Sequence, residues 1–178
     1  MLLDKTGGAV ADEWRHLADD ENAPEGEAVT VSLARWERDH NALKSRDAKL
    51  GLRLPNTANP VALNGEAHRF ALIALEFPRF NDGRAYSQAR LLRARLGYKG
   101  ALRATGEVLR DQLLFMLRAG FDSFEVDGVR AKAEDWAKAF GEFDVFYQPA
   151  EDNRSWVMRQ RFPAQFSQGA ATQSRSAI

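Results

Sequence analysis

The chain has 178 residues, of which 44% are hydrophobic and 28% are charged, a composition typical of one globular domain with a sizeable core. Basic and acidic residues both number 25, so the formal net charge is zero and no overall positive field favours nucleic acid. The chain has no cysteine, which excludes disulfides, thiolate catalysis and Cys-ligated zinc or iron–sulfur centres.

Residues 1–28 show no regular apolar pattern. They end in the acidic, turn-rich stretch "DDENAPEGE" at positions 19–27, so we expect an N-terminal extension of the domain. The first residues have neither the basic start nor the apolar core of a signal peptide. No stretch approaches the ~18 consecutive apolar residues of a membrane span. We therefore expect a cytoplasmic protein that does not bind a membrane.

From residue 29 onward, short apolar runs alternate with amphipathic helical patterns. The clearest run, "RFALIALEF" at 69–77, has the length and continuous hydrophobicity of a strand covered on both faces. After it, Ala85, Ala89, Leu92 and Leu96 recur at spacings of 4, 3 and 4 and form the apolar stripe of a helix. The predicted strands are 29–33, 50–54, 69–77, 101–105, 123–126 and 144–148, and helical patterns occupy 35–49, 84–96, 107–119 and 133–140.

This alternation predicts an α/β fold with a mainly parallel sheet of five or six strands joined by helical crossovers. An open layered sheet and a partial barrel fit the pattern equally well, whereas a complete eight-stranded barrel needs a longer chain. We assign 29–149 to a single α/β domain and 150–178 to a C-terminal extension. Within the extension, 155–162 suits a further strand or helix, and the chain after about 163 has the composition of a flexible tail.

The expected fold also indicates where a site should lie. In parallel α/β folds, ligands bind beyond the carboxyl ends of the strands, where the N-termini of helices also point. Two segments at such ends are rich in arginine and small polar residues. We therefore predict an anion-binding or partner-binding rim that consists of Arg79, Asp82, Arg84, Tyr86, Ser87, Arg103, Thr105, Arg110 and Asp111.

Several of these residues also have a structural interpretation. Asp82 and Thr105 stand where they could cap the helices that follow them. Arg103 lies within a predicted strand, so a buried position would require a paired carboxylate such as Glu76 or Glu125. Ligand contact and structural pairing both remain open for these side chains.

Carboxylates are the candidates for acid–base chemistry. Glu76 and Glu125 lie at the ends of two predicted strands and could form a carboxylate pair, and Asp82, which follows the first strand, is a further candidate for an acid–base group. The three histidines show no metal-ligand spacing, and no metal site is expected.

Positions 75–126 carry a specific resemblance to a known family. The segment "LEFPRFNDGRAYSQARLLRARLGYKGALRATGEVLRDQLLFMLRAGFDSFEV" is similar to the signature of the bacterial domain of unknown function nine-three-four. The resemblance extends over roughly 14–148, most of the chain. Members are often encoded beside sulfite reductase genes and labelled as oxidoreductases of sulfite reduction. The resemblance therefore implies a pathway, and it brings no catalytic residues to this chain.

The residues themselves do not support independent redox catalysis. After the first predicted strand, "VSLARWERDH" contains no glycine and hence no G-x-G-x-x-G turn. A G-x-x-x-x-G-K-[ST] phosphate loop is also absent from the sequence, and no cofactor is evident.

We therefore expect an accessory protein of assimilatory sulfite reduction. It would bind sulfite reductase subunits, or an anion of the pathway, through the arginine-rich rim. Two alternatives remain: an enzyme acting on a small anionic sulfur- or phosphate-containing substrate, and an electron-transfer subunit with a borrowed cofactor. The sequence leaves the oligomeric state open.

Overall fold

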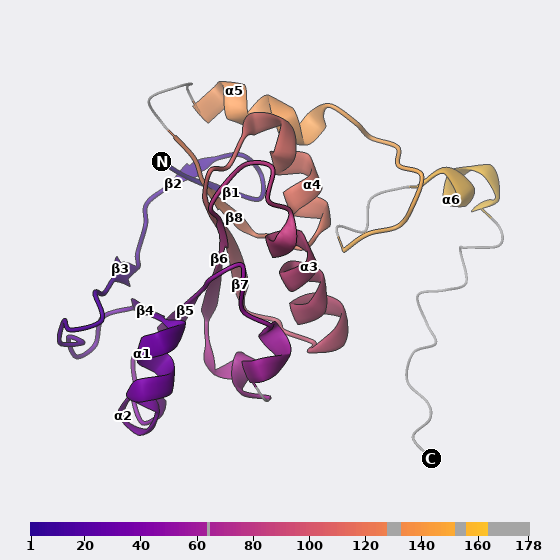
Figure 1. Ribbon diagram of the computed structural model, residues 1–178. Coiled ribbons are helices and arrows are strands. Elements are labelled where there is room, and N and C mark those ends of the chain that lie inside the picture. Colours follow the sequence, from indigo (N-terminus) through magenta and orange to yellow (C-terminus); the bar gives the residue numbers. More distant parts are fainter. Residues whose placement is uncertain (64, 128–132, 152–155, 164–178) are drawn as a thin grey trace, which may run out of the picture.

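The computed structural model describes residues 1–63, 65–127, 133–151 and 156–163, which form a curled sheet with helices packed against it (Figure 1). The strands lie in the order β2-β1-β8-β7-β6-β5-β4-β3. Their bounds are β1 (Leu2–Asp4), β2 (Ala9–Val10), β3 (Arg15–His16), β4 (Val29–Ser32), β5 (Leu50–Leu54), β6 (Leu72–Phe77), β7 (Ala101–Gly106) and β8 (Ser123–Glu125).

Short helices connect the strands. The α-helices are α1 (Leu33–Arg38), α2 (His40–Lys44), α3 (Arg84–Arg90), α4 (Leu113–Arg118), α5 (Ala133–Ala137) and α6 (Val157–Arg161). Four 3₁₀ turns and one π turn complete the described elements: η1 (Pro60–Leu63), η2 (Glu66–Arg69), η4 (Arg110–Gln112), η5 (Lys138–Gly141) and the π turn η3 (Leu91–Arg95). Within the described ranges, no helix has the length and apolar character needed to cross a bilayer.

Strands β3 to β8 run parallel, and each pairs with the next one along the chain. Strand β1 pairs antiparallel with β8, and β2 pairs antiparallel with β1. The mainly parallel α/β fold expected from the sequence is therefore confirmed. The sequential order of the parallel strands is that of part of a barrel. The sheet nevertheless stays open, because β2 and β3 lie at its opposite edges.

The described chain has eight strands where the sequence analysis predicts five or six. The additional ones come from residues 1–28, the segment interpreted above as an N-terminal extension, and contain only two or three residues each. Strands this short carry no readable alternation of apolar and polar residues. Leu3 and Leu17 from this segment are fully buried in the core, so residues 1–28 contribute both strands and core.

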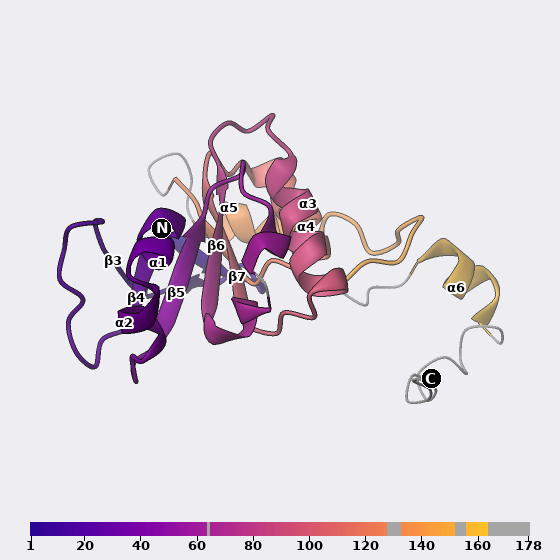
Figure 2. The same ribbon diagram turned by 60° about the horizontal axis from the view of Figure 1, so that its bottom comes forward.

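The apolar face of the central strands packs against α3 and α4, which lie side by side along it (Figures 1 and 2). The strand expected at 69–77 and the helical stripe after it are both present, because their apolar side chains meet in the core. The fully buried members of this contact are Ile73, Leu75, Phe77, Ala85, Ala89 and Leu92.

Two predicted elements differ from the structure. No strand forms at 144–148, where Phe146 makes only an isolated bridge with Trp156. The reason is that β1 occupies the edge of β8 where a further parallel strand would pair. The helix expected at 107–119 begins at Arg110, because β7 continues to Gly106 and turns there with a positive φ of 94°. In the C-terminal segment 155–162, the structure forms the helix α6 rather than a strand.

Candidate functional site

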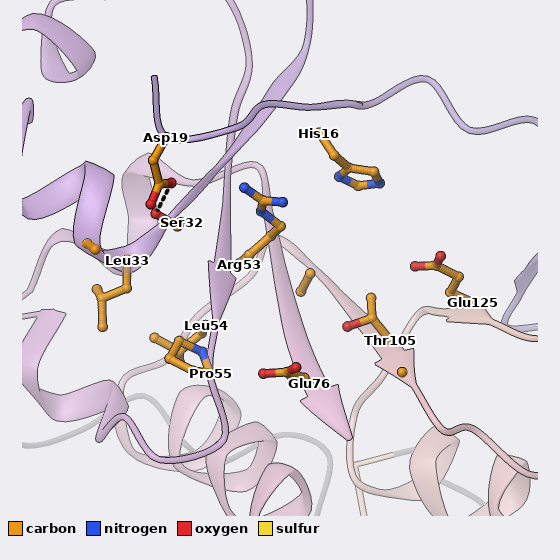
Figure 3. A pocket seen from close by; sticks show the side chains of 13 residues that line it. His16, Asp19, Ser32, Leu33, Arg53, Leu54, Pro55, Glu76, Thr105 and Glu125 are labelled. Atoms are coloured by element: carbon orange, nitrogen blue, oxygen red, sulfur yellow. Dashed lines mark hydrogen bonds between the residues drawn. The ribbon is translucent and has the colours of Figure 1, made fainter. Parts of the chain in front are cut away.

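A cleft of about 540 Å³ lies at the carboxyl ends of the parallel strands (Figure 3). We call it the sheet-end cleft. It occupies the sheet face that bears the polar side chains of the central strands, in a place where parallel α/β folds bind ligands. Its lining residues are His16, Asp19, Ser32, Leu33, Ala34, Arg53, Leu54, Pro55, Ala74, Glu76, Thr105, Gly106 and Glu125.

Strand register brings two carboxylates to the floor of the cleft. Glu76 on β6 pairs in register with Thr105 on β7, and Glu125 ends β8 on the far side of β7. The backbones of the two glutamates are therefore separated by two strand spacings, roughly 10 Å. Their carboxylates face the same space (Figure 3). Within the described part of the chain, neither side chain makes an ion pair or hydrogen bond.

The opposite wall is built by the chain before β4 and by β5. Ser32 caps α1 by accepting a hydrogen bond from Arg35 N at 3.0 Å, and its hydroxyl donates to Asp19 at 2.6 Å. Arg53 reaches from β5 into this wall and donates to the carbonyl of Leu17. The wall therefore offers one guanidinium, and the cleft as a whole carries three carboxylates, those of Asp19, Glu76 and Glu125.

Behind the cleft, an ion pair between a buried arginine and a partly exposed carboxylate holds the N-terminal segment to the sheet. Arg103 is only 3% exposed, and its Nη1 and Nη2 donate to the Asp12 carboxylate at 2.7 and 2.9 Å. Burial, the largest single influence, disfavours the charged form of Asp12. The hydrogen bonds from Arg103 and from Trp14 N, together with the positive charge of Arg103, outweigh it, and the pKa of Asp12 is lowered from its ordinary value. The partner of Arg103 is thus Asp12, and neither Glu76 nor Glu125 fills that role.

His16 lies between this ion pair and the cleft. Its Nδ1 is 2.7 Å from the hydroxyl of Thr30, and its Nε2 is 3.5 Å from the Asp12 carboxylate. These two contacts orient the imidazole, so that His16 forms a fixed part of the cleft wall.

The arginines predicted for the rim are largely engaged within the chain. Arg84 forms two hydrogen bonds with Asp82, at 2.9 and 2.6 Å, and Asp82 also accepts one from Asn56 at 2.8 Å. The bonds from Arg84 hold the pKa of Asp82 well below its usual range. Arg110 donates to the carbonyl of Asp135 at 2.8 Å and pairs with Glu142 at 2.6 Å. In this conformation, Arg84 and Arg110 therefore stabilise the fold through intramolecular ion pairs and hydrogen bonds.

The remaining rim residues differ in their burial and in the residues that they contact. Thr105 belongs to β7 and does not cap a helix. Its hydroxyl lies 3.4 Å from the carbonyl oxygen of Leu75 on the neighbouring strand. Tyr86 packs edge-on against Phe77 with ring centroids 5.2 Å apart, and burial raises its pKa to about 12. Arg79 and Ser87 are exposed, as is Phe80 between the strand and α3.

The predicted site residues therefore do not form one site. Glu76, Thr105 and Glu125 meet in the sheet-end cleft, whereas Tyr86 and Asp111 line a separate groove of about 820 Å³ beside α4. We call it the α4 groove. Its lining residues are Tyr86, Arg90, Asp111, Gln112, Phe115, Arg118, Ala119, Gln148, Pro149, Ala150 and Glu151.

Sequence reasoning missed one wall of the sheet-end cleft. Ser32 and Arg53 carry a readable signal, because Ser32 alternates with the valines of β4 and Arg53 is the one polar residue among the leucines of β5. His16 and Asp19 carry no such signal, since they belong to a segment whose position depends on pairing with β4.

The described residues do not bring three or more histidines or carboxylates together in a way that could hold a metal ion. The cleft can instead bind polar groups through carboxylate oxygens, the Thr105 hydroxyl and the Arg53 guanidinium. Its two floor carboxylates could also accept or donate protons.

The fold and the cleft define the class: an open, mainly parallel α/β protein with a cleft at the carboxyl ends of its strands that is lined by both charged and apolar side chains. The chain belongs to the family described as "Bacterial protein of unknown function (DUF934)", whose model matches residues 51–158, more than half of its length. The family expected from positions 75–126 is thereby confirmed. No curated protein and no solved structure matches the chain.

Proposed function

We propose that this protein binds a small polar ligand in the sheet-end cleft, as an accessory component of assimilatory sulfite reduction. The observation that carries the ligand-binding part is the cleft itself. It measures about 540 Å³ and lies at the carboxyl ends of parallel strands, and Glu76 and Glu125 on its floor pair with no described residue. Ligand sites commonly have volumes of roughly 300–1,000 Å³.

The charges of the cleft favour a particular kind of ligand. Three carboxylates face one guanidinium, so a free sulfite or sulfate anion would be repelled from the floor and attracted only toward Arg53. The cleft fits a ligand that donates hydrogen bonds from ammonium, amide or hydroxyl groups to Glu76 and Glu125. The same ligand needs an acceptor group that can bind the Arg53 guanidinium.

The pathway part of the proposal rests on the family resemblance. We assign contact with sulfite reductase subunits to the exposed part of the rim, where Arg79 and Ser87 flank Phe80, which is 53% exposed. An exposed aromatic side chain beside an arginine is the kind of anchor that protein interfaces use.

Ligand binding can be tested by thermal shift and by NMR titration with two sets of compounds, simple oxyanions and small polar amines. We expect amines to stabilise the protein, and Glu76→Gln or Glu125→Gln to weaken that binding at least tenfold, because each removes a charged acceptor. Glu37→Gln, at an exposed position on α1, is the matched control. Binding of oxyanions alone, or binding indifferent to both cleft variants, would contradict the proposed ligand class.

The sulfite reductase contact needs its own experiment. Binding of the purified chain to sulfite reductase from the same host can be measured by surface plasmon resonance. We expect Arg79→Glu to weaken it at least tenfold, whereas Arg95→Glu, the same charge change at another exposed position, leaves it unchanged. Absence of binding, or equal loss with both variants, would contradict the accessory role and leave the cleft proposal standing.

A second candidate function is an enzyme acting on the ligand of this cleft. The observation that favours it is the convergence of Glu76 and Glu125 on one cavity from two strands. If one glutamate transfers a proton, its glutamine variant should still bind the ligand but turn it over at least 100-fold more slowly. Equal losses of binding and turnover would indicate a binding protein only.

A further inference from the structure

The C-terminal part of the described chain exposes an unusual number of apolar side chains. We call residues 142–151 and 156–163 the C-terminal arm. Eleven large hydrophobic side chains are exposed in the described chain, and six of them lie in this arm. They are Phe143, Val145, Tyr147, Val157, Met158 and Phe162. Apolar surface concentrated in this way marks an interaction surface.

Helix α6 is the clearest case, because it contains no buried residue. Figures 1 and 2 both show it standing away from the sheet and its covering helices. Met158 is 40% exposed and Phe162 is 38% exposed. A helix of five residues is far shorter than the ~12–15 residues at which an isolated helix becomes marginally stable in water. Its folding therefore requires contacts with another surface.

The base of the arm, in contrast, is attached firmly to the domain. Arg118 at the end of α4 donates to the carbonyl of Gln148 at 2.7 Å and lies 3.5 Å from the centre of the Phe146 ring. The carbonyl of Arg118 accepts from Glu151 N at 3.1 Å. Val157 N donates to the carbonyl of Phe146 at 2.7 Å, which holds the start of α6 beside the anchored segment.

The α4 groove lies directly beside this attachment. Residues 148–151 form one of its walls, and Phe115 in the groove is 61% exposed. The groove carboxylates, Asp111 and Glu151, make no side-chain ion pair within the described ranges. Of the two groove arginines, Arg118 is engaged as described above. The groove therefore combines an exposed aromatic side chain with available carboxylates.

We infer that α6 of one copy docks in the α4 groove of a second copy, and that the exchange is reciprocal. Met158 and Phe162 would cover Phe115, and the basic residues of α6 would meet the groove carboxylates. The chain supports this charge match, since the sequence from position 153 to 178 contains four arginines and no acidic residue. A reciprocal exchange uses the same two patches on both copies and closes as a twofold dimer.

The first test is the oligomeric state of the full chain by analytical ultracentrifugation. We expect a dimer at tens of micromolar, and at least tenfold weaker association for Met158→Asp and for Phe115→Asp, because each places a charge in the apolar contact. Val61→Asp is the matched control, since Val61 is an exposed valine on η1. Circular dichroism verifies that the variants are folded. A monomer at all concentrations, or a dimer that neither arm nor groove variant weakens, would overturn the inference.

The absence of cysteine from the chain provides an independent test. A Phe115→Cys chain and a Met158→Cys chain, carrying different tags, are mixed and oxidised. We expect a disulfide between the two chains, which a Val61→Cys chain does not form with the Met158→Cys chain. A further variant carries both Phe115→Cys and Met158→Cys in one chain. If its disulfide forms only within that chain, the arm folds back on its own groove, and the exchange is overturned.

Discussion

At the scale of single residues, several arginines stabilise the fold through intramolecular hydrogen bonds and ion pairs, and others are surface charges. Arg93 illustrates this use. Its guanidinium donates to the carbonyls of Tyr98, Gly100 and Gly120 and to the Asp122 carboxylate. The most buried of these arginines is Arg103, which pairs with Asp12 from 91 positions away in the sequence. A cation in the core requires such a partner, because an uncompensated buried charge costs several kcal/mol.

We predict an asymmetry between the two members of this pair. Asp12→Ala leaves the buried Arg103 without its carboxylate and should lower the free energy of unfolding by about 3 kcal/mol. Arg103→Met removes the buried charge and leaves Asp12, whose side chain is 35% exposed, able to reach water. It should cost about 1 kcal/mol or less. Urea unfolding followed by circular dichroism measures both values, and equal losses would contradict the asymmetry.

The same pair predicts a dependence on pH. The pKa of Asp12 is lower in the folded protein than its ordinary value, so its ionised form stabilises the fold at pH values above about 4. This stabilisation is lost as the pH falls below 4 through the folded-state pKa. The difference in unfolding free energy between the wild type and Asp12→Ala should therefore shrink from pH 6 to pH 2. A difference that stays constant over this range would contradict this assignment of charge.

At the scale of elements, the end of β7 determines the shape of the cleft. Gly106 has a φ of 94°, and a Cβ atom there would lie 2.3 Å from the carbonyl oxygen of Phe77. This close approach lets Glu107 N donate a hydrogen bond to the carbonyl oxygen of Phe77 at 2.8 Å. It also delays the next helix until Arg110 and leaves Thr105 in the strand, where its side chain faces the cleft.

We predict that Gly106→Ala is destabilising by about 3 kcal/mol, because it adds a backbone clash to an unfavourable φ. Gly97→Ala is the matched control. Gly97 also has a positive φ, 63°, but a Cβ atom there would meet nothing within 4 Å, so it should cost only about 1 kcal/mol. Thermal and urea unfolding compare the two variants. A loss for Gly106→Ala no larger than that for Gly97→Ala would contradict the clash.

At the scale of the whole molecule, the N-terminal segment completes both sides of the sheet. Strand β1 covers the edge of β8 and β3 covers the edge of β4. Covering an edge also prevents the pairing of exposed strands between molecules. The segment between these strands supplies Asp12, and His16 of β3 forms part of the cleft wall. Residues 1–28 are therefore part of the domain in physical terms.

We predict that Leu3→Ala lowers the free energy of unfolding by about 3 kcal/mol, since Leu3 is fully buried on β1. Val10→Ala, in the same segment but 42% exposed, should change it by less than about 0.5 kcal/mol. Both are measured by urea unfolding of the full chain. A small effect of Leu3→Ala would show that β1 contributes little to the core.

The sequence was most informative where structure depends on neighbouring residues. The continuous apolar run at β6 and the stripe of α3 were correctly predicted, because periodicity reports directly which side chains meet the core. The parallel topology followed from the alternation of strands and helices. Glu76, Thr105 and Glu125, which the sequence analysis put at strand ends, line one cleft in the structure.

Other features depend on contacts between parts of the chain that are far apart in sequence, and no local pattern reveals them. No local pattern shows that Asp12 pairs with Arg103, that β1 pairs with β8, or that Arg110 pairs with Glu142. An arginine at a strand end reads the same in sequence whether it faces a ligand or a carboxylate far along the chain. The sequence alone was therefore sufficient to predict most of the elements between residues 29 and 126 and the parallel sheet, because both depend on local apolar patterns. The tertiary structure decided which charged groups remain available in the sheet-end cleft, because pairing depends on proximity in space.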